Sequence, residues 1–203
     1  MIRVLLVHDT YLLRAALAAL IGREPDLEVS SASWQRAVAM SDSLRPHVCV
    51  VDMDSPEAGG PGGLRELSGH GDARDDRAAL LALASAGRPG PLRRAYEEKA
   101  LGYLSKNASP DRLVEGIRHV ANGERYIDET LGFGFLEASE MPLTRRELSV
   151  LSLAAEGASV GEIARSLHLS NGTVRNYMAA ITRKTGARNR VDAIRISQVA
   201  GWV

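Results

Sequence analysis

Four ionisable side chains in the first 106 residues stand at the ends of short apolar segments. Asp9, Asp52, Asp54 and Lys106 each lie within three residues of the end of such a segment. Two carboxylates can hold a hard divalent cation such as Mg²⁺. A carboxylate can also attack a phosphoryl group, and a lysine can pair with the phosphoryl oxygens. If the fold brings them together, these residue types predict phosphoryl chemistry.

Alternating strands and helices are the elements that must position these side chains. Apolar runs rich in branched residues predict five buried parallel strands, at residues 2–7, 27–32, 47–51, 78–84 and 102–105. Segments with helical spacing lie between and after them, at 11–21, 33–44, 63–67, 92–99 and 110–122. Five such units predict a doubly wound parallel sheet, whose polar site lies at the carboxyl ends of the strands. His8, Ala84 and Ser85 fall at the same edge. The competing interpretation is that polar residues simply collect at strand ends.

The segment 142–203 predicts four helices without strands. Thr144 and Ser159 each precede a glutamate by three residues, which is the capping-box pattern. Ser170 can cap a longer helix that ends at Lys184. Short helices followed by a tight turn and a longer helix are typical of a helix-turn-helix.

The predicted long helix has one apolar side and one small, polar side. The apolar side carries Val174, Tyr177, Met178 and Ile181. The opposite side can enter a major groove, where arginine pairs with guanine and asparagine with adenine; it carries Asn171, Arg175, Asn176 and Ala179. Residues better placed for the DNA phosphates are Thr173, Arg183, Lys184 and Arg190.

The charges of the 203 residues are divided unevenly between these two parts. The whole chain has 25 basic and 25 acidic residues and no formal net charge. Residues 142–203 hold nine basic and four acidic residues, which leaves 16 and 21 for residues 1–141. The formal net charge of zero is therefore the sum of an acidic module and a basic module. The basic module is suited to binding nucleic acid.

The first part resembles a response-regulator receiver domain of the NarL/FixJ family. The matching strings are VLLVHD at 4–9, RPHVCVVDM at 45–53, GYLSKNASP at 102–110 and GERY at 123–126. The resemblance implies a flavodoxin-like receiver over residues 1–125, with Asp52 as phosphoacceptor, Asp9 as a metal-binding acid and Lys106 as the phosphoryl-contacting lysine. It also places Tyr103 at the aromatic switch position.

The sequence departs from the receiver pattern around this site. His8 replaces the first of two acids, and Ala84 replaces the switch hydroxyl, with Ser85 as the neighbouring hydroxyl. Alanine cannot donate a hydrogen bond to a phosphoryl oxygen. Because His8 stands where the pattern has an acid, Mg²⁺ at Asp9 and Asp52 is expected to bind weakly, with Asp54 as a compensating ligand. Conventional phosphoryl control stays open beside control by a small ligand or by constitutive dimerisation.

The last part is similar to LuxR-type helix-turn-helix domains. The strings that carry this resemblance are LTRRE at 143–147, GEIA at 161–164, LS at 169–170, GTVRNY at 172–177 and GARNR at 186–190. The resemblance implies base contacts from Arg175, Asn176 and position 179, and a dimer surface on the helix 191–200. The cap residues Thr144, Ser159 and Ser170 complete the predicted DNA-binding set. The string TVRNY and the final Gly201-Trp202 are most similar to the DesR-type branch.

Together these patterns predict a dimeric, sequence-specific transcriptional regulator of two-component type that is not an enzyme. Residues 126–141 are expected to form a partly helical linker. The expected partners are double-stranded DNA, a second copy, a sensor histidine kinase and RNA polymerase. Cys49 is alone, and no apolar run is long enough to span a membrane, so a cytoplasmic location is expected. Two other functions are alternatives: an Asp-based phosphatase using Asp52 and Asp54, and an adaptor that binds proteins but not DNA.

Overall fold

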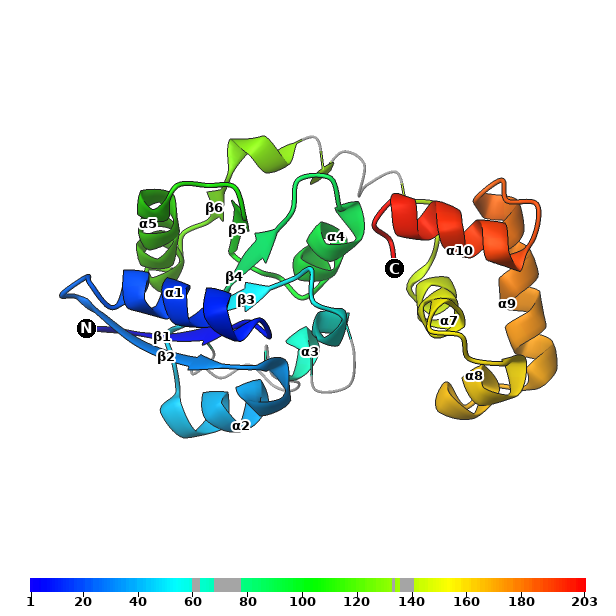
Figure 1. Ribbon diagram of the computed structural model, residues 1–203, viewed down its shortest axis with the longest axis horizontal. Helices are drawn as coiled ribbons and strands as arrows, with labels where there is room; N and C mark the ends of the chain where they lie inside the picture. The colour runs from blue at the N-terminus through cyan, green and yellow to red at the C-terminus, as the bar shows by residue number, and fades with distance from the viewer. Residues whose placement is uncertain (60–62, 68–77, 133, 136–140) are drawn as a thin grey trace. The chain divides into compact units, whose positions relative to one another are not determined.

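Two compact units make up the chain (Figure 1). The computed structural model describes residues 1–59, 63–67, 78–132, 134–135 and 141–203. The first unit comprises residues 1–86 and 91–135, and the second comprises residues 87–90 and 136–203. The first unit thus takes in residues 126–135, which the sequence had assigned to the linker.

A parallel sheet forms the centre of the first unit. Its spatial order is β2-β1-β3-β4-β5-β6, and every pairing is parallel. The strands are β1 (Ile2–Val7), β2 (Leu27–Ala32), β3 (Val48–Asp52), β4 (Ala79–Ala84), β5 (Gly102–Ser105) and β6 (Tyr126–Ile127). The order reverses between β1 and β3, so the carboxyl ends of these two strands border the crevice where such sheets place their sites.

Helices cover both faces of this sheet (Figure 1). One face packs in a core with residues of α2, α3 and α4, and the other packs with residues of α1 and α5. The helices are α1 (Tyr11–Ile21), α2 (Trp34–Leu44), α3 (Leu64–Leu67), α4 (Pro89–Glu97) and α5 (Pro110–Ala121), with short 3₁₀ turns η1 (Pro56–Gly59) and η2 (Glu129–Leu131). Burial on both faces explains why the strands read as continuous apolar runs.

The predicted five-stranded parallel sheet is present, with two differences. A sixth strand, β6, extends it; with two residues it is too short to give a strand pattern in the sequence. Helix α4 begins at Pro89, three residues before the predicted start at residue 92, because proline is tolerated in the first turn, where no intrahelical donor is needed. Residues 60–62, between the third predicted strand and the third predicted helix, lie outside the described residues.

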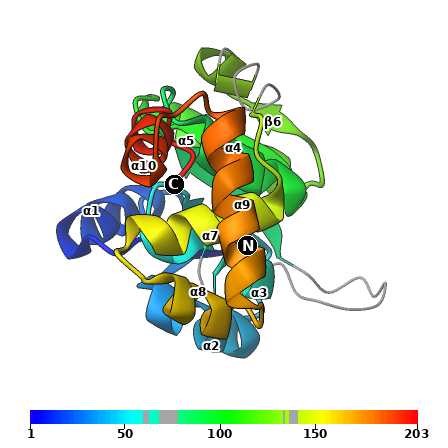
Figure 2. The ribbon, with the colours of Figure 1, turned by 90° about the vertical axis from the view of Figure 1, so that its right-hand side faces the viewer.

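Four helices form the described part of the second unit, residues 141–203. They are α7 (Arg145–Ala155), α8 (Val160–Ser166), α9 (Asn171–Lys184) and α10 (Arg190–Val199). Figure 2 shows this unit toward the viewer, with the long α9 running past α7 and α8. Buried side chains from all four helices form one apolar core, among them Leu151, Ile163, Ile181 and Ala193. The predicted helix-turn-helix is therefore a folded unit with its own core.

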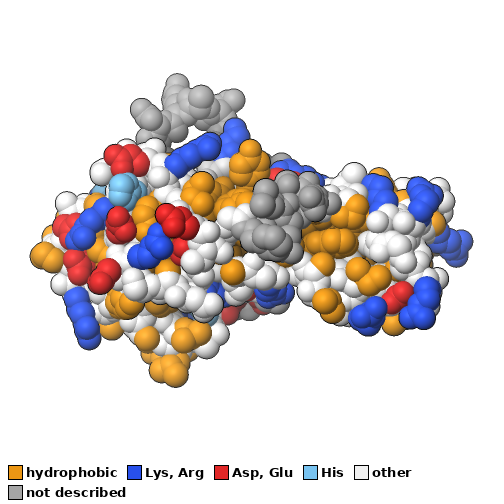
Figure 3. All heavy atoms as spheres, turned by 90° about the horizontal axis from the view of Figure 1, so that it is seen from above, with side chains coloured by type: hydrophobic (Ala, Val, Ile, Leu, Met, Phe, Trp, Pro, Cys, Tyr) orange, Lys and Arg blue, Asp and Glu red, His pale blue; other side chains and the backbone are white. Residues whose placement is uncertain are grey.

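The charge division of the sequence is visible on the surface. Figure 3 shows side chains of both signs on the first unit and mainly basic side chains on the second. Among the residues that the structure describes, no helix is long and apolar enough to cross a membrane.

Candidate functional site

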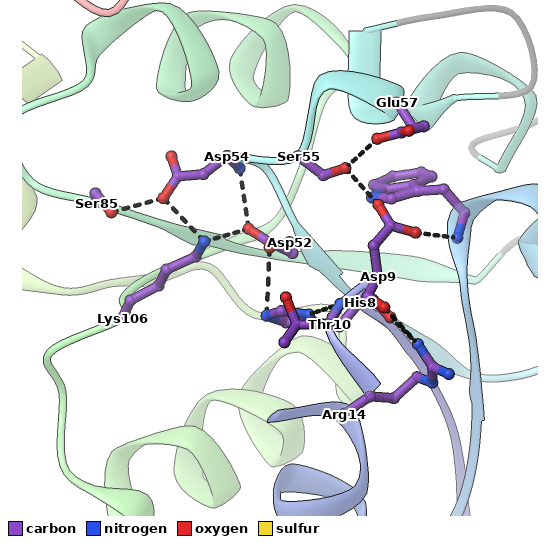
Figure 4. Close-up of polar contacts among 11 residues, drawn as sticks. His8, Asp9, Thr10, Arg14, Asp52, Asp54, Ser55, Glu57, Ser85 and Lys106 are labelled. Atoms are coloured by element: carbon purple, nitrogen blue, oxygen red, sulfur yellow. Dashed lines mark hydrogen bonds and ion pairs between the residues drawn. The ribbon is translucent and has the colours of Figure 1, made fainter. Parts of the chain in front are cut away.

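The ends of three strands bring a histidine, an aspartate and a lysine together in the first unit (Figure 4). His8 follows β1, Asp52 ends β3 and Lys106 follows β5. The backbone N–H of Lys106, directly after β5, donates to the carbonyl of Ala84 at the end of β4 over 3.0 Å. This bond fixes the backbone of the lysine beside the end of β4. These elements place the predicted phosphoacceptor and the predicted phosphoryl-contacting lysine side by side.

Both carboxylate oxygens of Asp52 already have partners within the chain. Its Oδ1 contacts the Lys106 ammonium and accepts a hydrogen bond of 3.0 Å from the backbone N–H of Asp54. Its Oδ2 lies 3.3 Å from Nε2 of His8. The Asp52 side chain is 8% exposed, so these contacts replace much of its hydration. Attack on a phosphoryl group would require at least one of them to be given up.

His8 faces Asp52 with its Nε2, 3.3 Å from the carboxylate oxygen Oδ2. The backbone N–H of Thr10 donates to Nδ1 of His8 over 3.1 Å, so Nδ1 is the unprotonated nitrogen and Nε2 carries the proton. Burial lowers the pKa of His8 below its usual value; the charge of Asp52 opposes this shift and the Lys106 ammonium adds to it. His8 thus supplies an N–H group where the receiver pattern has an acid. Its position directly before Asp9 is the feature of the sequence that could have predicted this role.

Asp54 and Ser85 extend the same network. The Lys106 ammonium lies 2.9 Å from Asp54 Oδ2, and the Ser85 hydroxyl donates to the same oxygen over 2.6 Å. Ser85 therefore contacts Asp54 and reaches Asp52 only through it. Ala84, at the predicted position of the switch hydroxyl, is fully buried.

Asp9 faces away from this network and stabilises the start of α2. Its Oδ1 accepts a hydrogen bond of 3.0 Å from the backbone N–H of Trp34, and its Oδ2 accepts one of 2.5 Å from the Ser55 hydroxyl. Ser33, the N-cap of α2, makes no side-chain cap bond. Asp9 therefore satisfies an N–H at the helix start that would otherwise lack an acceptor. Sequence reasoning missed Ser55 and Trp34 as its partners.

These contacts do not fit a magnesium site at Asp9 and Asp52. Asp9 is held by Trp34 and Ser55, and Asp52 by Lys106 and His8. Within the described parts of the chain, no three or more His, Cys, Asp or Glu side chains are grouped to hold a metal ion. Mg²⁺ at this site stays a prediction of the sequence.

Tyr103 is buried beside the last residues of the first unit. Its ring meets the ring of Phe135 edge to face, with centroids 4.9 Å apart. Burial raises the pKa of Tyr103 to about 12. The predicted switch aromatic is therefore a packed, neutral core residue.

Helix α9 presents its predicted groove side to solvent. Val174, Met178 and Ile181 are buried in the core of the second unit, whereas the exposed residues are Asn171, Arg175, Asn176 and Ala179. Ser170 accepts a hydrogen bond of 3.1 Å from the backbone N–H of Thr173, so a side-chain cap fixes the start of the exposed face. Contact of these residues with DNA bases stays a prediction.

The residues predicted to contact phosphates differ in their surroundings. Arg183 is exposed on α9. The Lys184 ammonium pairs with Glu147 Oε2 at 2.8 Å, and the Arg190 guanidinium donates to the carbonyls of Ala154 and Ala158 at 3.3 and 2.6 Å. Lys184 and Arg190 therefore tie the helices of the second unit together.

The three predicted cap residues all cap helices. Thr144 accepts from the backbone N–H of Glu147 and Ser159 from that of Glu162, each over 3.3 Å, and each glutamate accepts in return from the cap residue's N–H. The hydroxyls of Ser170 and Thr173 are also hydrogen-bonded, at 2.8 Å. All three caps are exposed.

A parallel α/β unit with an Asp–Lys site at its strand ends, followed by a helix-turn-helix, is the architecture of a response regulator. Residues 141–197 match the family "Bacterial regulatory proteins, luxR family". The chain is 52% identical over 206 residues to the response regulator RamR of Streptomyces coelicolor, covering 100% of this chain and 98% of that protein. It is 36% identical over 205 residues to the transcriptional regulatory protein DesR of Bacillus subtilis, covering 100% and 99%. A solved structure titled as two RcsB dimers bound to two parallel DNAs matches with a TM-score of 0.58 and 19% identity, covering 98% of each chain.

The chain belongs to the response regulators of the NarL/FixJ type with a LuxR-type helix-turn-helix domain. It is a DNA-binding transcriptional regulator of the two-component class. The relatives named above include a response regulator and a transcriptional regulatory protein.

Proposed function

We propose that the protein binds a specific DNA operator as a homodimer and that control of its receiver does not require phosphorylation of Asp52. The observation that carries this proposal is that both oxygens of the Asp52 carboxylate already contact other groups of the chain. Lys106 and the Asp54 N–H hold one oxygen, and His8 faces the other. A sensor histidine kinase is then not needed for control. A small ligand or self-association takes that role, in the cytoplasm, where the DNA lies.

A phosphodonor experiment tests the control mechanism. The full chain is treated with phosphoramidate, and its mass and DNA affinity are measured with an Asp52→Asn variant as control. We expect no mass difference between treated and untreated wild type, and no change in affinity. A gain of one phosphoryl group that is absent from Asp52→Asn, together with tighter DNA binding, would overturn the proposal.

The DNA-reading part of the proposal places the exposed side of α9 in a major groove. Arg175 and Asn176 are exposed on that side, and a good bidentate pair discriminates between bases by about 1–3 kcal/mol. An operator is first selected from random duplexes, and binding of the Arg175→Ala, Asn176→Ala double variant is then compared with wild type. We expect the variant to lose sequence preference. Unchanged operator binding would refute the assignment of this face.

RNA polymerase is the remaining partner that we propose, since a DNA-bound regulator acts on transcription through it. Transcription in vitro from a promoter that carries the selected operator tests this contact. We expect the purified regulator to change transcript yield with polymerase alone. Full operator occupancy with unchanged yield would contradict a direct contact.

A further inference from the structure

Helix α9, which runs in front of α7 and α8 in Figure 2, carries two small residues on its exposed side. Gly172 and Ala179 are separated by about two turns of the helix, so they lie on the same side of it. Arg175 and Asn176 stand between them, about one turn from each. The small residues thus share one exposed face with the polar ones, and this face, made of Gly172, Arg175, Asn176 and Ala179, is here called the reading face.

The contacts within the chain do not explain the glycine at position 172. Its φ is not in the left-handed region. Among the described residues, a Cβ added to it would meet only the Ser170 hydroxyl oxygen, at the ordinary contact distance of 3.7 Å. Alanine is more favourable than glycine inside a helix, because glycine loses more conformational freedom on folding. Close approach of another molecule to the helix is the remaining physical reason for a glycine here.

Ala179 is the residue of the reading face that has a side chain but cannot form a hydrogen bond. Its methyl group is exposed one turn after Arg175 and Asn176. In a major groove, the C5-methyl group of thymine is the apolar group that a base edge presents, and alanine is among the side chains that contact it. Ala179 lies about 6 Å beyond Arg175 along the helix, which is close to two base-pair steps of about 3.4 Å.

We propose that Ala179 selects a thymine in each half-site of the operator by contact with its C5-methyl group, and that Gly172 lets α9 approach the DNA closely enough for this contact. The inference rests on the proposed function, because it takes the reading face to lie in a major groove. It goes further in naming a group that the operator must contain. That thymine lies about two base-pair steps from the guanine that Arg175 can bind.

Removal of the thymine methyl group tests the contact. An operator is selected from random duplexes with the full chain, and each thymine of one half-site is then replaced in turn by deoxyuridine, which lacks only the methyl group. We expect one replacement to raise the wild-type Kd about fourfold, the effect of burying one methyl group less. Ala179→Gly should bind the thymine and deoxyuridine operators with equal Kd, because it has no methyl group to make the contact.

Ala180→Gly is the matched control. Ala180 is the next residue of α9 and is less exposed than Ala179, because it lies off the reading face. The control therefore carries the same loss of helix propensity and should keep the preference for thymine over deoxyuridine. Equal effects of deoxyuridine on wild type and on Ala179→Gly would overturn the proposal, as would an operator in which no thymine is sensitive to the replacement.

Gly172→Ala gives a second measurement, whose sign separates folding from DNA contact. We expect its urea midpoint of unfolding to rise, because alanine favours the helix and the added Cβ has room. We expect its operator Kd to rise about fivefold or more, as overpacking at a close contact does. A variant that is more stable and binds the operator as tightly as wild type would refute the role of Gly172.

Failure of the proposed function and failure of this inference give different results. A wild-type chain for which no operator can be selected from random duplexes would refute the proposed function, and this inference with it. A selected operator that wild type binds equally well with and without thymine methyl groups would refute this inference alone.

Discussion

At the scale of single residues, the Asp52 site is a set of mutual contacts among polar side chains. Lys106 supplies a positive charge to Asp52 and Asp54, and His8 supplies a neutral donor to Asp52. A buried carboxylate is tolerated only when such donors compensate for its lost hydration. The residue that departs most from the receiver pattern, His8, is one of those donors.

His8 makes stability fall as the pH falls below about 6.5, the usual histidine pKa. Its pKa in the folded chain is lowered by burial, so on acidification the unfolded chain takes up a proton first. Proton uptake by the unfolded state alone favours unfolding. We expect the loss of unfolding free energy between pH 7.5 and pH 5.5, measured with urea, to be smaller in His8→Gln than in wild type. His168→Asn, at an exposed position, is the control and should keep the wild-type slope.

Lys106 is predicted to stabilise the fold mainly by compensating two carboxylates. Breaking a buried pair costs about 3–5 kcal/mol; because the Lys106 side chain is 29% exposed, we expect about 2 kcal/mol for Lys106→Met. Asp52→Asn should reduce that cost, since one of the charges left behind is gone. Urea unfolding of both single variants and the double variant measures this coupling. Additive effects would contradict direct compensation.

At the scale of elements, the contacts made at helix ends determine which polar side chains are available to contact DNA. Thr144, Ser159 and Ser170 cap the starts of α7, α8 and α9. Lys184 links the end of α9 to the capping box of α7, and Arg190 binds carbonyls at the end of α7. Exposed α9 residues such as Arg183 make no such contact between helices within the described part of the second unit.

Substitutions of Arg183 and Arg190 are therefore expected to affect different properties. The first should change DNA binding, and the second should change stability. Arg183→Ala should reduce the slope of log Kd against log salt by about one phosphate contact, with little change in stability. Arg190→Ala should lower the unfolding free energy by about 1 kcal/mol, because it removes hydrogen bonds to two carbonyls. Salt titration of operator binding and urea unfolding measure the two effects. A large stability loss in Arg183→Ala would count against this division.

At the scale of the whole molecule, the first unit exposes apolar side chains at the start of α1. Tyr11, Leu12 and Leu13 are 76, 75 and 51% exposed. In the second unit, Val191 and Val199 of α10 are also largely exposed. Adjacent exposed apolar residues mark a site of association. The start of α1 is therefore the receiver surface that we expect a second copy to cover.

Leu12→Glu should weaken the dimer and, with it, operator binding. Two linked helix-turn-helix units bind two half-sites far more tightly than one unit binds one, because the second contact is intramolecular. We expect sedimentation to show a shift toward monomer and the operator Kd to rise about tenfold or more. Gln35→Glu adds the same charge at an exposed position on α2 and should leave both unchanged. An unaltered dimer in Leu12→Glu would place the interface elsewhere.

The sequence alone determined the order of the elements, the helix-turn-helix and the main residues of the site. Apolar runs marked the buried strands β1, β3 and β4, and the cap patterns at Thr144 and Ser159 marked two helix starts. These features are local, since a strand or a cap depends on residues close together in the chain.

Only the tertiary structure decided the partners of the polar side chains. It turned Asp9 toward Trp34 and Ser55, set His8 against Asp52, and made Asp128 of the supposed linker a buried anchor of β5. Each of these contacts joins residues 20 or more positions apart. A carboxylate binds whichever donors the packing brings within reach, and its position in the sequence does not reveal which these are.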